Sequence, residues 1–165
     1  MRKSINEAKS NNLTIKLAPV HIDMGPTGFI VYAEDFLSAF YSFTSEKPFS
    51  PAKYYLVCRS IELAFKSFLS LNKIPIREIR YALGHDLMKI LSKVKDVDIN
   101  KVVEISDREE TEIKKANNWY SRKGFEYFAI KNILESKETL PNLDILQLLA
   151  ARLIKILKPL CLSST

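Results

Sequence analysis

Apolar residues recur at three-and-four spacing through every long stretch of this chain, and Pro-marked turns separate those stretches. Such spacing places apolar side chains on one face of a helix, whereas a half-buried strand requires strict alternation. Only four Gly occur among the 165 residues, so few positions interrupt the helical pattern. We therefore expect an all-α fold, an antiparallel bundle of about five helices with no sheet.

Helix start and stop signals give the expected bounds of these helices. Ser50 followed by Pro51 is an N-cap with Pro at the first helical position, and Ser106 with Glu109 three residues later has the pattern of a capping box. The segment "MGPTG" is expected to break the chain, leaving residues 1–27 polar and irregular and 28–165 as a single helical domain. The helices are expected at 29–43, 51–71, 85–94, 106–120 and 141–157.

Composition narrows the class of protein. Apolar residues make up 47% of the chain and charged residues 27%, as in ordinary globular proteins. The formal net charge of +6 is compatible with an acidic or nucleic-acid partner but does not require one. Cys58 and Cys161 lie far apart with no Cys/His cluster, so we expect no metal and no cofactor. Without a signal peptide or a spanning apolar run, the expected location is the cytoplasm, with no membrane association.

The helix expected at 51–71 carries two charges one turn apart in an otherwise apolar run. Glu62 and Lys66 have the favourable order for an i to i+4 ion pair, worth about 0.2–0.5 kcal/mol on an exposed helix. From spacing alone, a solvated pair is the simpler interpretation. The alternative is a buried polar brace between two helices, formed by Glu62 and Lys66 together with His85 and Asp86.

Two segments carry a family resemblance. "YYLVCRSIELAFKSFLSLN", with Glu62 and Lys66 in an E-x-x-x-K arrangement, is followed by "YALGHDLMKIL", in which Gly84, His85 and Asp86 open a GHDL motif. In this order and spacing they resemble the HEPN superfamily, helical domains named for higher eukaryotes and prokaryotes nucleotide-binding. The resemblance covers about a quarter of the chain. It implies a bundle of four or five helices, pairing as a homodimer, and a role in prokaryotic defence, toxin–antitoxin or nucleotidyltransferase-associated systems.

The same resemblance supplies a catalytic hypothesis. Catalytic members are metal-independent ribonucleases with an Arg followed after four to six residues by a His, and the two copies in a dimer line one cleft. Arg80 and His85 have that spacing. A His can take the proton of a ribose 2′-hydroxyl, and an Arg can stabilise the charge that develops on the attacked phosphate.

Three features of this sequence favour the non-catalytic interpretation. Tyr81 follows Arg80 where catalytic members have a polar residue, Gly84 interrupts the helix, and positions five apart on an α-helix point about 140° from each other. We therefore expect the brace of Glu62, Lys66, His85 and Asp86 to be largely buried. The favoured function is a non-catalytic RNA- or protein-associated module. The alternative is a ribonuclease that uses Arg80 and His85 across a dimer cleft.

The last expected helix is apolar over more than half of its circumference, which exceeds what one core-facing stripe needs. A central core helix, a subunit interface and a basic amphipathic helix on a membrane are the three explanations, in that order of preference. We expect a homodimer that uses part of the 141–162 helix.

Two further groups of residues are weaker candidates for a site. "WYSRKGFEYF" mixes aromatic and cationic side chains, which could contact RNA through Tyr120, Arg122, Lys123 and Phe125 or form a core-packing cluster. His21 and Asp23 lie two residues apart in a loop-like stretch, and two ligands do not make a metal site.

Overall fold

The computed structural model describes residues 25–46, 49–127 and 140–163. Within these ranges every regular element is helical and no strand occurs, so the expected all-α fold is confirmed. In chain order the elements are α1 (Pro26–Ser42), α2 (Pro51–Leu71), a π-helical turn η1 (Glu78–Ala82), α3 (Leu87–Asp96), a 3-10 turn η2 (Ile99–Lys101), α4 (Asp107–Tyr120) and α5 (Leu143–Leu162).

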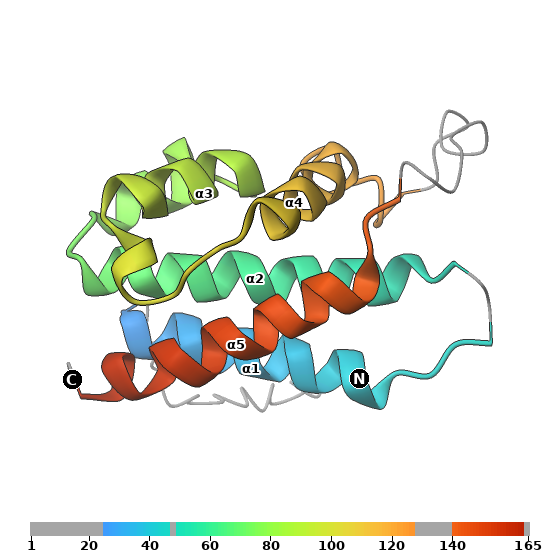
Figure 1. Cartoon of the computed structure of the whole chain (residues 1–165), viewed down its shortest axis with the longest axis horizontal. Coiled ribbons are helices and arrows are strands. Elements are labelled where there is room, and N and C mark those ends of the chain that lie inside the picture. Colours follow the sequence, from blue (N-terminus) through green and yellow to red (C-terminus); the bar gives the residue numbers. More distant parts are fainter. Residues whose placement is uncertain (1–24, 47–48, 128–139, 164–165) are drawn as a thin grey trace, which may run out of the picture.

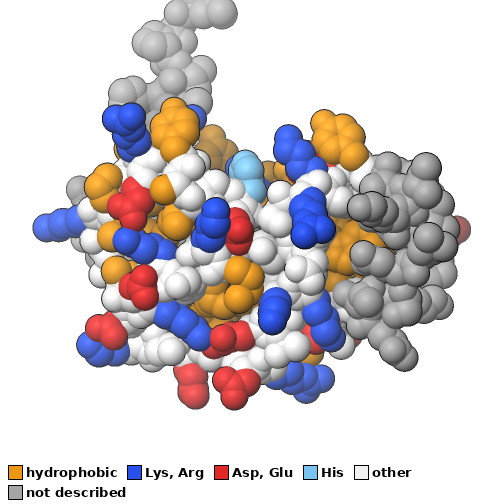
Figure 2. Space-filling model, turned by 90° about the horizontal axis from the view of Figure 1, so that it is seen from above, with side chains coloured by type: hydrophobic (Ala, Val, Ile, Leu, Met, Phe, Trp, Pro, Cys, Tyr) orange, Lys and Arg blue, Asp and Glu red, His pale blue; other side chains and the backbone are white. Residues whose placement is uncertain are grey.

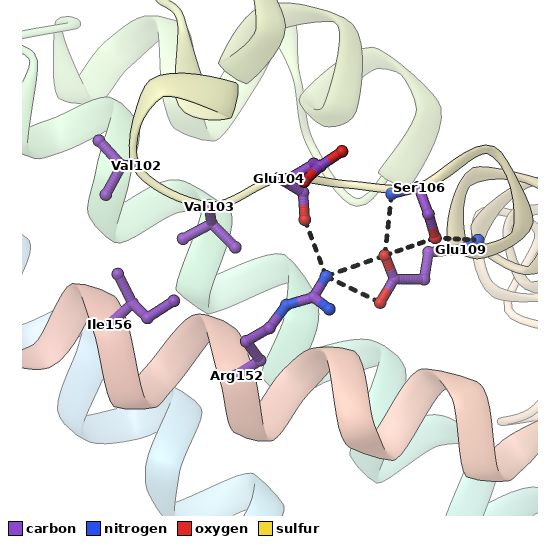
Figure 3. A pocket seen from close by; sticks show the side chains of 7 residues that line it. All are labelled: Val102, Val103, Glu104, Ser106, Glu109, Arg152 and Ile156. Carbon is purple, nitrogen blue, oxygen red and sulfur yellow. Dashed lines mark hydrogen bonds and ion pairs between the residues drawn. The ribbon is translucent and has the colours of Figure 1, made fainter.

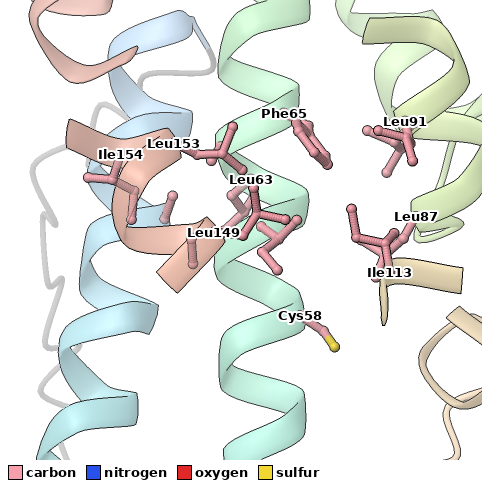
Figure 4. Packing of buried hydrophobic residues seen from close by; sticks show 14 of the residues in the cluster. Cys58, Leu63, Phe65, Leu87, Leu91, Ile113, Leu149, Leu153 and Ile154 are labelled. Carbon is pink, nitrogen blue, oxygen red and sulfur yellow. The ribbon is translucent and has the colours of Figure 1, made fainter. Parts of the chain in front are cut away.

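Helix α2 is the centre of the bundle. In Figure 1 it runs between α1 and α5 on one side and α3 and α4 on the other. Its side chains from Val57 to Leu69 are therefore almost all buried, on every face of the helix. Figure 4 shows both contacts: side chains of α2 meet those of α5 on one side and those of α3 and α4 on the other, and the labelled residues are Cys58, Leu63, Phe65, Leu87, Leu91, Ile113, Leu149, Leu153 and Ile154. The sequence pattern predicted one buried face for this helix, whereas the structure buries side chains on all of its faces between Val57 and Leu69.

Several helix bounds differ from the expected ones for local reasons. Helix α1 begins at Pro26, three residues before the expected start, because the fixed φ of Pro suits the first helical position. The expected break therefore does not extend past Gly25, which is the N-cap of the helix. Helix α3 begins at Leu87, since Asp86 is its N-cap and accepts hydrogen bonds from the backbone N–H groups of Met88 and Lys89.

Most of the apolar circumference of α5 is covered within one chain. The helix packs against α2, α1 and α4, and its buried residues are Leu146, Leu149, Ala150, Leu153, Ile154, Leu157 and Cys161. Its exposed apolar side chains are Leu148, Leu160 and Leu162. The central-core explanation accounts for the width, so the width gives no support to a second copy of the chain. In the part of the chain that is described, none of the helices has the length and apolar character needed to span a bilayer.

The loop between η2 and α4 is fastened to α5 by an ion pair (Figure 3). Ser106 and Glu109 form the expected capping box, which is confirmed at the start of α4. The guanidinium of Arg152 donates to both carboxylate oxygens of Glu109 and to the carbonyl of Glu104, each at 2.8 Å. Glu109 is buried, and its charge is balanced by Arg152. Ser106, Glu109 and Arg152, which are bonded to one another here, line a recess of about 390 Å³.

Replacing Ser106 with Ala is expected to lower the free energy of unfolding by about 1 kcal/mol, because the hydroxyl caps α4 and also donates to Glu109. Urea denaturation of the two proteins measures the difference. Ser92→Ala is the matched control, since Ser92 is exposed in the middle of α3. Equal unfolding midpoints for Ser106→Ala and Ser92→Ala would contradict the capping role.

Candidate functional site

The carboxylate of Glu62 is the centre of a polar network inside the bundle. Its side chain is fully buried on α2, where one turn of helix separates it from the partly exposed Arg59 and the buried Lys66. Oxygen Oε1 accepts hydrogen bonds from Arg59 Nη1 at 2.8 Å and Lys66 Nζ at 2.7 Å. Oxygen Oε2 accepts from the hydroxyl of Tyr120 at 2.6 Å. The interpretation of Glu62 and Lys66 as a solvated pair was therefore wrong.

This network keeps Glu62 ionised and Tyr120 neutral. Burial alone would raise the pKa of Glu62, but the hydrogen bond from His85 and the charges of Lys66 and Arg59 outweigh it and lower the pKa to about 2. Burial raises the pKa of Tyr120, and the neighbouring charge of Glu62 raises it further. Tyr120 is therefore a hydrogen-bond donor to a carboxylate that only accepts.

Lys66 also fixes the turn that carries His85. Its ammonium donates to the carbonyl of Gly84 at 2.6 Å, and Gly84 has a φ of +55°, in the region that favours glycine. Asp86, two residues on, does not join the Glu62 network. It accepts from Asn117 Nδ2 at 3.0 Å, and Asn117 Oδ1 in turn accepts from the backbone of Leu87. The expected brace thus contains Glu62, Lys66 and His85, whereas Asp86 caps α3.

His85 lies at the outer edge of this network. Its Nδ1 is 3.1 Å from both oxygens of Glu62 and 3.0 Å from Arg59 Nη1. Nδ1 cannot donate to Glu62 and accept from Arg59 at once, and the ionised carboxylate is the stronger partner, so we assign the proton to Nδ1. In the neutral form of this ring, Nε2 is then the unprotonated nitrogen. The side chain of His85 is 60% exposed, so the expectation that it is largely buried was wrong.

Arg80 and His85 line the same pocket, which has a volume of about 360 Å³. Arg59, Lys66 and Tyr81 contribute to its wall, and Phe29 and Leu63 supply its apolar part. The 140° separation expected for an α-helix does not apply, because η1 is π-helical and closes with an i to i+5 bond from the N–H of Leu83 to the carbonyl of Glu78. The guanidinium of Arg80 lies 5.7 Å from the ring centre of Tyr81.

The aromatic stretch at the end of α4 has both buried and exposed rings. Tyr120 and Phe125 are buried, and Phe125 stacks on Trp119 at a centroid distance of 5.8 Å. Of the two alternatives for these rings, contact with RNA or a core-packing cluster, the structure has the core packing. Arg122 and Lys123 are exposed on this turn.

Metal binding finds no support in the described residues, which contain no group of three or more His, Cys, Asp or Glu side chains arranged to hold an ion. His21 and Asp23 lie outside the described residues. Sequence reasoning also missed two members of the Glu62 network. Arg59 carried a usable signal, because it lies three residues before Glu62 on one helix. Tyr120 carried none, since 58 residues separate it from Glu62.

The comparisons with known proteins identify no relative. The chain matches no family model, no curated protein and no solved structure.

Proposed function

We propose that this chain is a HEPN-like, RNA-associated helical protein that binds a phosphate group of RNA in the pocket around Arg80 and His85. The observation that carries the proposal is the convergence of Arg59, Lys66, Arg80 and His85 on one recess. Arg and Lys side chains supply most of the affinity for RNA phosphates, and the planar Arg fork suits phosphate oxygens. The family resemblance of the GHDL segment supplies the wider context, a prokaryotic defence or toxin–antitoxin type system.

Among the cations of the pocket, Arg80 is the best placed to form a new ion pair with a ligand. Within the described residues it takes part in no ion pair, whereas Arg59 and Lys66 both contact Glu62. Tyr81, with 75% of its surface exposed, stands next to it at the rim and presents a ring that a base can stack on. An incoming phosphate would therefore meet a cation that has no ion-pair partner among the described residues, next to an exposed aromatic ring.

Replacing Arg80 with Ala is expected to weaken binding of single-stranded RNA about tenfold, because it removes a charge-assisted hydrogen bond. Fluorescence anisotropy with a labelled oligonucleotide measures the affinity. Arg77→Ala is the matched control, since Arg77 is exposed on the same segment but does not line the pocket. Equal losses in the two variants would show that general charge, not the pocket, holds the RNA.

A metal-independent ribonuclease is the second candidate, and the placement of His85 favours it. With Nδ1 hydrogen-bonded to Glu62, Nε2 is free to take the proton of a 2′-hydroxyl. The 2′-oxygen would then attack the phosphorus and expel the 5′-oxygen, which takes up a proton. The products would be a 2′,3′-cyclic phosphate and a 5′-hydroxyl end, and Arg80 would stabilise the charge on the phosphate oxygens.

Replacing His85 with Ala is expected to slow RNA cleavage at least about a hundredfold if His85 is this base. The assay uses purified protein and RNA in the presence of a chelator, with His21→Gln as the matched control. His85→Ala also removes a hydrogen bond to Glu62, so the melting temperature of the variant is measured beside its activity to show that the protein is folded at the assay temperature. Sedimentation of the same samples tests the homodimer that the resemblance implies. Cleavage that persists in His85→Ala would rule out this role.

A further inference from the structure

The pocket around Arg80 and His85 carries more positive charge than an internal RNA phosphate can balance. Arg59, Lys66 and Arg80 line it with three cations, and Glu62 beneath them contributes one negative charge. Three minus one leaves a net charge of +2 with His85 neutral. A phosphodiester supplies a single negative charge, whereas a phosphomonoester carries about −1.5 to −2 near neutral pH.

The buried members of this cluster make the excess charge persistent. Glu62 is fully buried and Lys66 nearly so, and both are held by hydrogen bonds rather than by solvent. Charges that are partly shielded from water interact more strongly with a ligand than surface charges do. A doubly charged group entering the recess is therefore favoured over a singly charged one.

On the face formed by α3 and α4, the cations do not form a continuous track for the RNA backbone. Figure 2 looks down on α3 and α4 and shows Lys and Arg side chains interspersed with Asp and Glu rather than merged into a stripe. Several of these cations are neutralised by neighbours, in the pairs Lys93–Glu78, Lys95–Glu110 and Lys115–Glu112. Recognition on this side of the molecule is thus concentrated in the recess.

We infer that the pocket recognises a phosphomonoester, the terminal phosphate of an RNA strand, in preference to an internal phosphodiester. Arg80 and Arg59 face the phosphate oxygens, and the exposed ring of Tyr81 receives the terminal base. This inference rests on the proposed binding of RNA at the pocket. Free phosphate and mononucleotides carry the same chemical group, so the experiment includes a separate arm for that source.

The experiment compares single-stranded oligonucleotides of one sequence that differ only at their ends. Three forms are needed: a 5′-phosphate with a 3′ label, a 5′-hydroxyl with the same label, and a 3′-phosphate with a 5′ label. We expect a phosphorylated end to bind at least about fivefold more tightly than the hydroxyl end. Arg80→Ala should abolish that difference, and Arg77→Ala, the control variant outside the pocket, should retain it.

The arms separate failure of this inference from failure of the proposed function. Equal affinity for phosphate and hydroxyl ends, with Arg80 still required, would overturn the end preference and leave RNA binding intact. If no RNA binds but inorganic phosphate raises the melting temperature of the wild type and not of Arg80→Ala, the phosphomonoester pocket stands and RNA is the wrong source. The absence of both effects would overturn the inference and the proposed function together.

Discussion

Replacing Glu62 with Gln is expected to lower the free energy of unfolding by about 3–5 kcal/mol, the range for removing one partner from a buried ionic network. The amide keeps the shape of the side chain but removes its charge. Arg59 and Lys66 would then face each other without a counter-charge, and His85 and Tyr120 would lose their carboxylate acceptor. Guanidinium chloride unfolding, followed by circular dichroism, measures the loss.

The matched control for that substitution is Glu34→Gln. Glu34 pairs with Lys158 between α1 and α5, and both side chains are more than one-third exposed. An exposed ion pair contributes about 1 kcal/mol or less, so this variant should unfold close to the wild type. If the Glu62 variant fails to fold in plain buffer, sucrose added to all samples restores a measurable transition. Similar losses for the two substitutions would contradict the role of Glu62 as the centre of the network.

Acidification is expected to remove about 3 kcal/mol of stability through Glu62 alone. The pKa of Glu62 is 4.5 in an unperturbed carboxyl group, as in the unfolded chain, and about 2 in the folded protein. Each pKa unit of difference corresponds to about 1.4 kcal/mol of stability. Because the folded value is the lower one, the unfolded chain binds more protons between these two values, and stability rises with pH in that window. The contribution is complete above about pH 4.5 and is lost as the pH falls toward 2.

A difference curve isolates this effect from that of the other carboxylates. Burial would raise the pKa of Glu109, but the hydrogen bonds from Ser106 and Arg152 lower it. The stability that Glu109 contributes is therefore also lost as the pH falls. The Glu62→Gln variant keeps the Glu109–Arg152 ion pair. The difference in stability between wild type and variant therefore measures the contribution of Glu62 alone. The gap should be widest above pH 4.5 and narrow toward pH 2. A gap that stays constant across this range would show that Glu62 is not held ionised by its partners.

The exposure of His85 decides how the network relates to function. A brace that served stability alone would bury all of its members, yet His85 opens onto a pocket with Arg80. Glu62 and Lys66 are buried beneath His85. Glu62 bonds to its ring nitrogen Nδ1, and Lys66 bonds to the carbonyl of Gly84 in the turn before it. The two interpretations of the GHDL segment are therefore compatible, because the buried charges orient a histidine that remains accessible.

The sequence determined the helices, because their signals are local. Spacing of apolar residues, the Ser50–Pro51 start of α2 and the capping box of α4 all act within one or two turns, and the structure has each of them. The Glu62–Lys66 contact was also readable, since four residues on a helix place two side chains together. Whether that contact faced water or the core could not be read in this way.

Only the tertiary structure decided the site. The burial of Glu62 depends on helices packed on every side of α2, and Tyr120 reaches it from 58 residues away. The meeting of Arg80 and His85 depends on a π-helical turn that periodicity does not predict, followed by a glycine with positive φ. Local rules fix the direction of a side chain relative to its own helix. The neighbours that the side chain meets are set by the packing of separate helices, through contacts distant in sequence.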